Sequence, residues 1–293
     1  MALASVGLAL LFLLPGTDGL NQGLAFRPIA NVVGGLVIGV GMVVARSCVS
    51  GLFHKLGSGM LGALVGLVAL VGLAGWAAGE LLARQLTVPG PTVLPGGEAA
   101  TLPGVLGLPR PLVAALLLTT VSVALWRRPG RESPRYDWQW GWRRIGVGLG
   151  VVITTGWAMA GLGGSSFGPS SVGAVASVAG GSPNYWLITF LVGIVAGGTL
   201  SARTAGGFWL RGEEPVRYLQ LVAGGLLLGA GGWIAGGCNL GHGLSGVAQL
   251  NVSSFVVVAA MVGGVWLARL APHRFRRWSS ETEPTRPSRL RSG

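Results

Sequence analysis

Residues 222–241, VAGGLLLGAGGWIAGGCNLG, decide the fold that we expect for this chain. The stretch carries no charge, and its apolar part ends in glycines that flank a cysteine. A helix needs about 20 mainly apolar residues to cross roughly 30 Å of hydrocarbon in a bilayer. Residues 218–236 come close to that length. We therefore predict a membrane-spanning helix that is broken by glycines beside a thiol.

A second copy of this pattern occurs at 32–51, VVGGLVIGVGMVVARSCVSG. When the two stretches are aligned end to end without a gap, nine of twenty positions are identical: Val32/Val222, Gly34/Gly224, Gly35/Gly225, Leu36/Leu226, Gly39/Gly229, Gly41/Gly231, Ala45/Ala235, Cys48/Cys238 and Gly51/Gly241. The chain has 2 cysteines, and the alignment pairs them. Apolar composition alone would not readily do this, so the two stretches indicate an internal repeat.

The composition of the whole chain supports a membrane protein. Of its 293 residues, 51% are hydrophobic and 10% are charged, and 53 are glycine. Soluble domains carry about 25% charged residues. Two cysteines do not make a disulfide framework, and no CxxC or paired Cys/His spacing suggests zinc. We expect an all-α polytopic membrane protein without a metal or cofactor.

Apolar blocks and charges predict about eight spans, each bounded to within a few residues. They are 1–14, 30–46, 60–79, 111–126, 145–162, 184–202, 218–236 and 252–270. The first is short for a span. Because no Lys or Arg precedes its apolar run, we favour a retained helix over a cleaved signal peptide.

The net charge of +12 comes mainly from arginine clusters that flank apolar spans. Six arginines lie in 127–144 and seven lie between 269 and the end. The positive-inside rule accounts for such clusters, so we do not infer nucleic-acid binding. The rule places both clusters in the cytoplasm, and counting spans places both termini there too. We expect a multi-pass protein of the inner (plasma) membrane, in contact with its lipid.

One membrane domain, 1–270, is expected, with halves at about 1–79 and 145–270 joined by 80–144. The basic residues 271–293 would form a cytoplasmic tail without regular structure. By this topology, span 30–46 runs inward and span 218–236 runs outward. The copies are then inverted, as in many transporters whose broken helices build a site near the middle of the membrane.

Two segments are too short to cross and too apolar for a solvated loop, namely 163–183 and 236–251. Irregular backbone at membrane depth is tolerated only where it is buried in protein or lines a cavity. We therefore predict short re-entrant helices in both. If the segments after the two repeats fold inward, Cys48 and Cys238 approach one path from opposite faces.

The predicted path takes its residues from these broken segments. Gly236, Gly237, Gly241 and Gly51 would allow sharp turns and close approach of backbones. A helix that restarts near Asn239 would point its positive end at Cys238 and at an anion there. The other expected path residues are Cys48, Lys55, His242 and Ser165, of which Ser165 belongs to a group with Ser166, Ser170 and Ser171.

The motif AGGCNLGHGLSG at 235–246 resembles the YeeE/YedE family of sulfur-transport membrane proteins, whose pattern is G-G-C-N-x-G-[HN]-G-L-S-G. The first half, RSCVSGLFHKLGSG at 46–59, is a weaker match. It keeps Cys48, Gly51, Lys55, Gly57 and Gly59, but has Arg46-Ser47 for two glycines and Ser58 for an acidic residue. The resemblance extends loosely over about 30–268.

The resemblance implies an inverted-repeat helical bundle that takes up thiosulfate or a related small sulfur anion. Family members are thought to pass the anion along cysteines through S–H···S contacts, and some have more than two. Here Cys48 and Cys238 would need further donors, such as Ser165, Asn239 or His242. A cytoplasmic sulfur-carrier protein is a further expected partner.

Two other classes of function stay open at this point. One is a membrane-embedded sulfurtransferase or redox enzyme with a cysteine nucleophile, for which His242 is the only base near Cys238. The other is a non-transporting membrane subunit that docks a cytoplasmic partner through 127–144. No second carboxylate or cofactor motif supports the enzyme, and we predict a transporter or channel and no enzyme.

Overall fold

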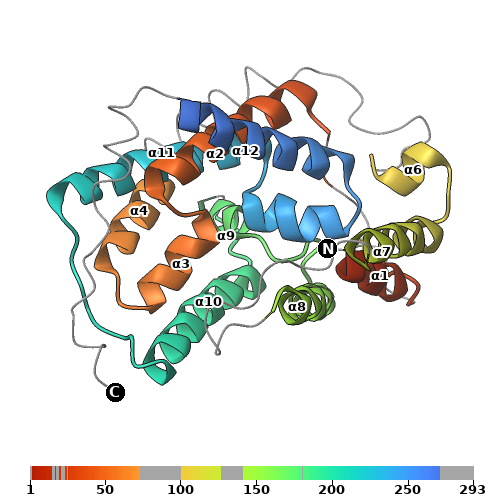
Figure 1. Cartoon of the computed structure of the whole chain (residues 1–293), viewed down its shortest axis with the longest axis horizontal. Coiled ribbons are helices and arrows are strands. Elements are labelled where there is room, and N and C mark those ends of the chain that lie inside the picture. Colours follow the sequence, from red (N-terminus) through yellow and green to blue (C-terminus); the bar gives the residue numbers. More distant parts are fainter. Residues whose placement is uncertain are drawn as a thin grey trace.

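The structure is a computed structural model that describes residues 2–14, 17, 20, 24, 26–72, 100–126, 141–179 and 181–270. Every regular element in this part of the chain is a helix. Figure 1 shows α2 (Pro28–Ala45), α11 (Pro215–Ala235) and α12 (Val252–Leu270) together on one side of the molecule. The all-α prediction is confirmed.

Five helical segments are long and apolar enough to cross a membrane, at 28–57, 144–162, 185–204, 215–235 and 252–270. They coincide with five of the predicted spans and belong to α2 with α3 (Val49–Gly57), α8 (Trp142–Leu162), α10 (Tyr185–Thr204), α11 and α12. Large apolar side chains on these helices are exposed, among them Leu162, Val192 and Val262. Such surfaces suit contact with lipid, and the chain is a multi-pass membrane protein.

The other three predicted spans form shorter helices, so a count of eight is not confirmed. They are α1 (Ala2–Leu11), α4 (Leu61–Val71) and α7 (Arg110–Trp126). A helix rises only about 1.5 Å per residue, so α1 and α4 are each shorter than the hydrocarbon thickness. The end of predicted span 60–79, most of the basic loop 127–144 and the tail 271–293 lie outside the described residues.

The centre of the fold is the crossing of α2 and α11. A β-carbon added at Gly34 would lie 2.5 Å from the Ala235 nitrogen, and one added at Gly224 would lie 2.6 Å from the Ala45 nitrogen. Gly34 is aligned with Gly224 in the repeat, and the same alignment pairs Ala45 with Ala235. The N-terminal half of α2 meets the end of α11, and the end of α2 meets the N-terminal half of α11. The two helices therefore run antiparallel.

A second reciprocal pair of contacts lies between the first two. A β-carbon added at Gly41 would lie 3.0 Å from the Leu228 nitrogen, and one at Gly231 would lie 2.8 Å from the Ile38 nitrogen. These glycines let the two backbones pack directly against each other, as small residues do in membrane helix pairs.

The flanking helices also exchange partners between the halves. Besides each other, α2 contacts α12, and α11 contacts α4. Added β-carbons at Gly35 and Gly225 would lie 2.7 Å from the Val257 oxygen and 3.0 Å from the Ala69 β-carbon. By contrast, nothing lies within 4 Å of a β-carbon added at Gly193 or Gly197 on α10. Glycine spacing alone did not distinguish glycines at helix contacts from glycines that face open space.

The predicted re-entrant segments contain short helices. Segment 163–183 contains α9 (Ser171–Ala179), and segment 236–251 contains the π-helix η2 (Asn239–Gly246). Both contact α11 or α12 and each other. A separate group is formed by α1, α7 and α8, where Trp157 is fully buried beside Phe12 and Phe167.

Candidate functional site: two cysteine turns

The first turn follows α2. Its helix ends with Arg46 in the left-handed region at φ 50°, and Cys48 then precedes α3 in an extended conformation at φ −84° and ψ 173°. The Ser47 nitrogen donates to the Met42 oxygen at 3.1 Å, which closes the helix end. A non-glycine residue in this region is uncommon. The turn thus contains local strain next to a thiol.

The second turn repeats this backbone at the aligned positions of the other half. The α11 helix ends with Gly236 at φ 78°, and Cys238 precedes η2 at φ −102° and ψ −173°. The Gly237 nitrogen donates to the Gly232 oxygen at 2.9 Å. Both cysteines therefore occupy the position directly before a short helix, where backbone N–H groups and the helix dipole favour an anion.

The two short helices that follow the cysteines contact each other. Cys238 also belongs to the same buried cluster as Val49 and Leu52 of α3. The two turns therefore belong to one packed region of the protein. In Figure 1, α2, α11 and α12 lie on one side of α3 and α9, and α10 lies on the other side.

The thiol of Cys238 is completely buried and has a polar neighbour. Its Sγ lies 2.8 Å from the Ser171 Oγ, and either atom can be the donor. Ser171 begins α9, so the predicted re-entrant segment 163–183 does supply a hydroxyl to this site. It is Ser171, rather than Ser165, that meets the thiol.

Ser165 lies at a different place in the same segment. Its Oγ donates to the Phe167 oxygen at 2.9 Å and accepts from the Asn184 Nδ2 at 3.3 Å. Asn184 caps the start of α10. Ser165 thus joins the segment to α10, and the structure does not bring it to Cys238.

The thiol of Cys48 is partly exposed and lies among polar groups of its own turn. Its Sγ accepts from the Gly51 nitrogen at 3.4 Å and lies 3.3 Å from the Ser50 Oγ. Lys55 Nζ donates to the Arg46 oxygen at 2.8 Å, so Lys55 ties α3 back to the end of α2. The charges of Arg46 and Arg217 act on the same ammonium group, together with that of Glu213.

His242 is buried and both of its ring nitrogens have protein partners. Nε2 lies 3.1 Å from the Ala235 oxygen, which can only accept, so Nε2 carries a proton. Nδ1 lies 3.0 Å from the Ser254 Oγ. The ring therefore ties the end of α11 to the first turn of α12 and holds the Cys238 turn in place.

The predicted path glycines lie where other groups approach closely. A β-carbon at Gly237 would lie 2.9 Å from the His242 ring, and one at Gly241 would lie 3.1 Å from the Ser170 Oγ. One at Gly51 would lie 2.6 Å from the Ser47 Oγ. Asn239, directly after Cys238, is partly buried. These residues lie in or directly after the two turns.

Two arginines also belong to these turns, although the sequence analysis did not assign them to the site. Arg217 donates to the Val44 oxygen at 3.4 Å, to the Ala45 oxygen and to the Gln220 Oε1 at 3.0 Å. Arg27 Nη2 would lie 2.9 Å from a β-carbon at Gly236. Arg27 aligns with Arg217 when the repeat comparison is continued upstream without a gap. That extension would have found both residues.

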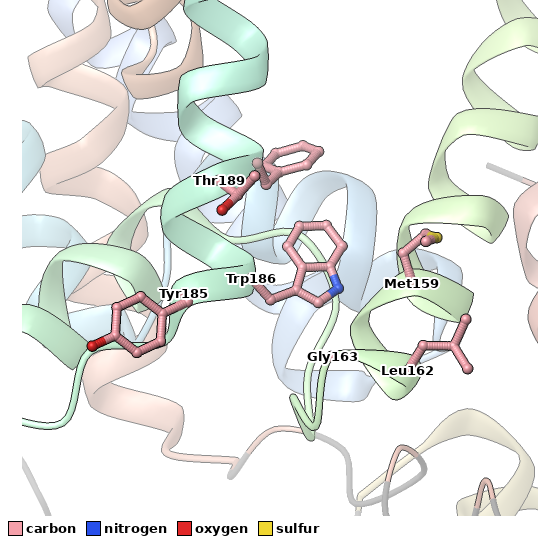
Figure 2. A pocket seen from close by; sticks show the side chains of 7 residues that line it. Met159, Leu162, Gly163, Tyr185, Trp186 and Thr189 are labelled. Atoms are coloured by element: carbon pink, nitrogen blue, oxygen red, sulfur yellow. The ribbon is translucent and has the colours of Figure 1, made fainter.

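An open pocket beside α8 lies away from the thiols. It has a volume of about 590 Å³ and lies between the end of α8 and the start of α10. Figure 2 shows Trp186 between the two helices, with Met159 and Leu162 on α8. None of its lining residues is charged or a thiol. Its chemistry does not suit a small anion.

Within the described residues, no three His, Cys, Asp or Glu side chains gather to hold a metal ion.

The fold and the turns define the class of protein. Apolar spans enclose two matched helix breaks, each with a thiol before a helix start, and this arrangement is typical of transporters with broken helices. The chain belongs to the sulphur transport family, whose model matches residues 1–267. The resemblance to YeeE/YedE proteins is confirmed, and the chain is a transporter rather than an enzyme.

Two relatives carry a more specific name. The chain is 34% identical over 254 residues to the thiosulfate transporter TsuA of Spirochaeta thermophila, which covers 81% of this chain and 76% of the relative. It is 25% identical over 287 residues to the thiosulfate transporter TsuA of Escherichia coli, which covers 91% of this chain and 78% of the relative.

Proposed function

We propose that this protein carries thiosulfate across the inner membrane along a path that runs past the Cys238 turn and the Cys48 turn. The observation that carries the proposal is the matched backbone of the two turns, each of which places a cysteine directly before one of two contacting short helices. The names of the two relatives support thiosulfate as the anion.

The proposed path follows an inverted repeat. Reciprocal contacts between Gly34 and Ala235 and between Gly224 and Ala45 support a two-fold relation between the antiparallel helices α2 and α11. If these helices cross the bilayer, that axis lies in the membrane plane. Cys48 then faces the cytoplasm and Cys238 faces outside, with both chain termini in the cytoplasm. The domain limits 1–270 and the tail 271–293 follow the same scheme.

The two cysteines suit the soft end of the anion. Thiosulfate has one terminal sulfur and three oxygens, and a thiol can donate a hydrogen bond to the terminal sulfur. If the Ser171 hydroxyl donates to the Cys238 Sγ, the S–H of Cys238 is left free for the anion. Weak contacts of this kind at successive positions allow passage, because binding that is too strong would hold the anion in place.

Lys55 and His242 have supporting parts in this proposal. The Lys55 ammonium gives the inner turn a positive charge while it bonds the Arg46 oxygen. His242 holds the outer turn through Ala235 and Ser254. Gly51, Gly237 and Gly241 keep the turns compact, and Asn239 offers an amide next to Cys238. Ser165 does not contact Cys238 and supports the site indirectly, because it joins segment 163–183 to α10.

Growth on thiosulfate as the sole sulfur source tests the proposal. A cell that lacks sulfate uptake should grow when it makes the wild-type protein, and should fail to grow with a variant that carries Cys48→Ala and Cys238→Ala. A variant with Cys48→Ser and Cys238→Ser keeps a polar donor at each turn and should grow slowly. Equal amounts of each protein in the membrane are the control. Normal growth with the double alanine variant would reject the cysteine path.

A further inference from the structure

The two arginines of the repeat differ in what they bond. All three contacts of Arg217 are made to protein groups at the end of α2 and to Gln220. Arg27 lies at the corresponding place beside Gly236, but its Nε is buried without a hydrogen-bond partner among the described residues. The charge of Arg27 also acts on His242. The outer arginine therefore has a donor to offer, whereas the inner arginine is used within the protein.

A buried amide lies one helical turn from Arg27. Asn31 is fully buried, and neither its Nδ2 nor its Oδ1 has a hydrogen-bond partner in the part of the chain that the structure describes. Buried polar side chains are nearly always bonded to protein or water, so an orphaned amide needs a reason. A polar group of this kind at membrane depth marks a candidate functional site.

Asn31 is on the face of α2 that packs against α12 and against the end of α11, the helix that leads into the Cys238 turn. The next residues on this face, Gly34 and Gly35, meet Ala235 of α11 and Val257 of α12. His242 joins the same two helices through Ala235 and Ser254. Arg27, Asn31 and the Cys238 turn therefore all belong to the region where α2, α11 and α12 meet.

The repeat shows that the amide is not required by the fold. The residue aligned with Asn31 in the other half is Leu221, which is buried in the core. The same helix position thus accepts an apolar side chain there. A leucine at position 31 would satisfy packing without leaving an unpaired amide.

We propose that Arg27 and Asn31 form the outer capture site for the oxygens of a sulfur oxyanion, before its terminal sulfur meets Cys238. This inference rests on the proposed function and adds the residues that recognise the oxyanion end. An arginine donates several N–H groups in a fixed fork that suits such oxygens. The Asn31 amide group would add a donor from inside the helix interface, where water competes little.

Three variants test the capture site: Asn31→Leu, Asn31→Asp and Arg27→Gln. We expect Asn31→Leu to weaken thiosulfate binding about tenfold, the effect of losing one hydrogen bond to a charged group. The same variant should unfold at a higher temperature, because it removes an unpaired buried amide. Asn31→Asp should weaken binding more, since it adds a like charge. Arg27→Gln should also weaken binding at least tenfold.

Two measurements on purified full-length protein separate the outcomes. Calorimetric titration with thiosulfate gives the affinity, and uptake of labelled thiosulfate into proteoliposomes gives KM and the maximal rate. Higher KM with a preserved maximal rate in Asn31→Leu supports the capture site. Unchanged affinity in both Asn31→Leu and Arg27→Gln overturns it, even when wild-type uptake is normal. Binding without uptake by the wild type would overturn the transport proposal alone, and absence of any thiosulfate binding would overturn both.

Discussion

At the Cys48 turn the left-handed residue is an arginine and the thiol is partly exposed, whereas at the Cys238 turn that residue is a glycine and the thiol is fully buried. The backbone hydrogen bonds of the two turns correspond residue by residue. The repeat therefore determines where each cysteine lies, while the surroundings of each thiol are set by residues that the repeat does not share. A path through both turns would offer the anion two different environments.

The first prediction concerns which thiol matters more for uptake. Cys238→Ala should lower thiosulfate uptake at least about tenfold, because no water or neighbouring thiol can replace a donor at a fully buried position. Both cysteines have a serine hydroxyl beside them, but water can reach only the partly exposed Cys48 site, so Cys48→Ala should lower uptake less, about threefold. Uptake into vesicles with matched protein amounts measures both. A larger loss for Cys48→Ala would reverse the comparison.

The second prediction concerns the hydroxyl beside the buried thiol. Ser171→Ala removes the group 2.8 Å from the Cys238 Sγ and should lower uptake about fivefold, the effect of about one hydrogen bond. Ser177→Ala is the control on the same helix, where the Oγ donates to the Ala174 oxygen and accepts from the Asn184 nitrogen, and does not meet the thiol. The control should keep most of the activity. Equal losses in the two variants would show that any change in α9 lowers uptake, independent of the thiol.

The third prediction concerns the helix crossing that joins the turns. Gly34→Ala and Gly224→Ala should each destabilise the protein by about 1–3 kcal/mol, because the added methyl would meet backbone atoms of the opposite helix. Gly197→Ala on α10 should be neutral or stabilising by up to about 1 kcal/mol, since open space surrounds that position. Thermal unfolding in detergent measures all three. A reciprocal crossing is contradicted when only one of the first two variants is destabilised.

The fourth prediction concerns Arg46 and Gly236, the residues with positive φ at the two turns. Arg46→Gly should relieve about 1 kcal/mol of backbone strain, and Gly236→Ala should introduce a similar cost, since both positions have positive φ. The unfolding temperature should therefore rise for the first variant and fall for the second. A fall in both would mean that the Arg46 side chain stabilises its turn by more than the strain costs.

The sequence predicted the elements that depend on apolar length and on the repeat. Charge-free blocks predicted the five long helical segments, and the paired cysteines predicted the two matched turns. For the predicted span 60–79, the structure describes α4 over Leu61–Val71, and the rest of that span lies outside the described residues.

Side-chain partners were less predictable than helix positions. Ser165 and Ser171 are both small hydroxyl residues in one segment, and only the fold decides which one meets Cys238. Arg27 and Arg217 align when the repeat comparison is continued upstream. An arginine at the end of a span, however, is first interpreted as a determinant of membrane topology. Only the structure shows that the Asn31 amide has no hydrogen-bond partner among the described residues.

Thiol labelling from the two faces of the membrane tests the central claim most directly. In sealed vesicles of known orientation, a membrane-impermeant thiol reagent should label Cys48 from the cytoplasmic face in a Cys238→Ser variant. It should label Cys238, more slowly, from the outer face in a Cys48→Ser variant, and thiosulfate should slow both reactions. Labelling of both cysteines from the same face, or rates that thiosulfate leaves unchanged, would contradict a shared path between oppositely facing turns.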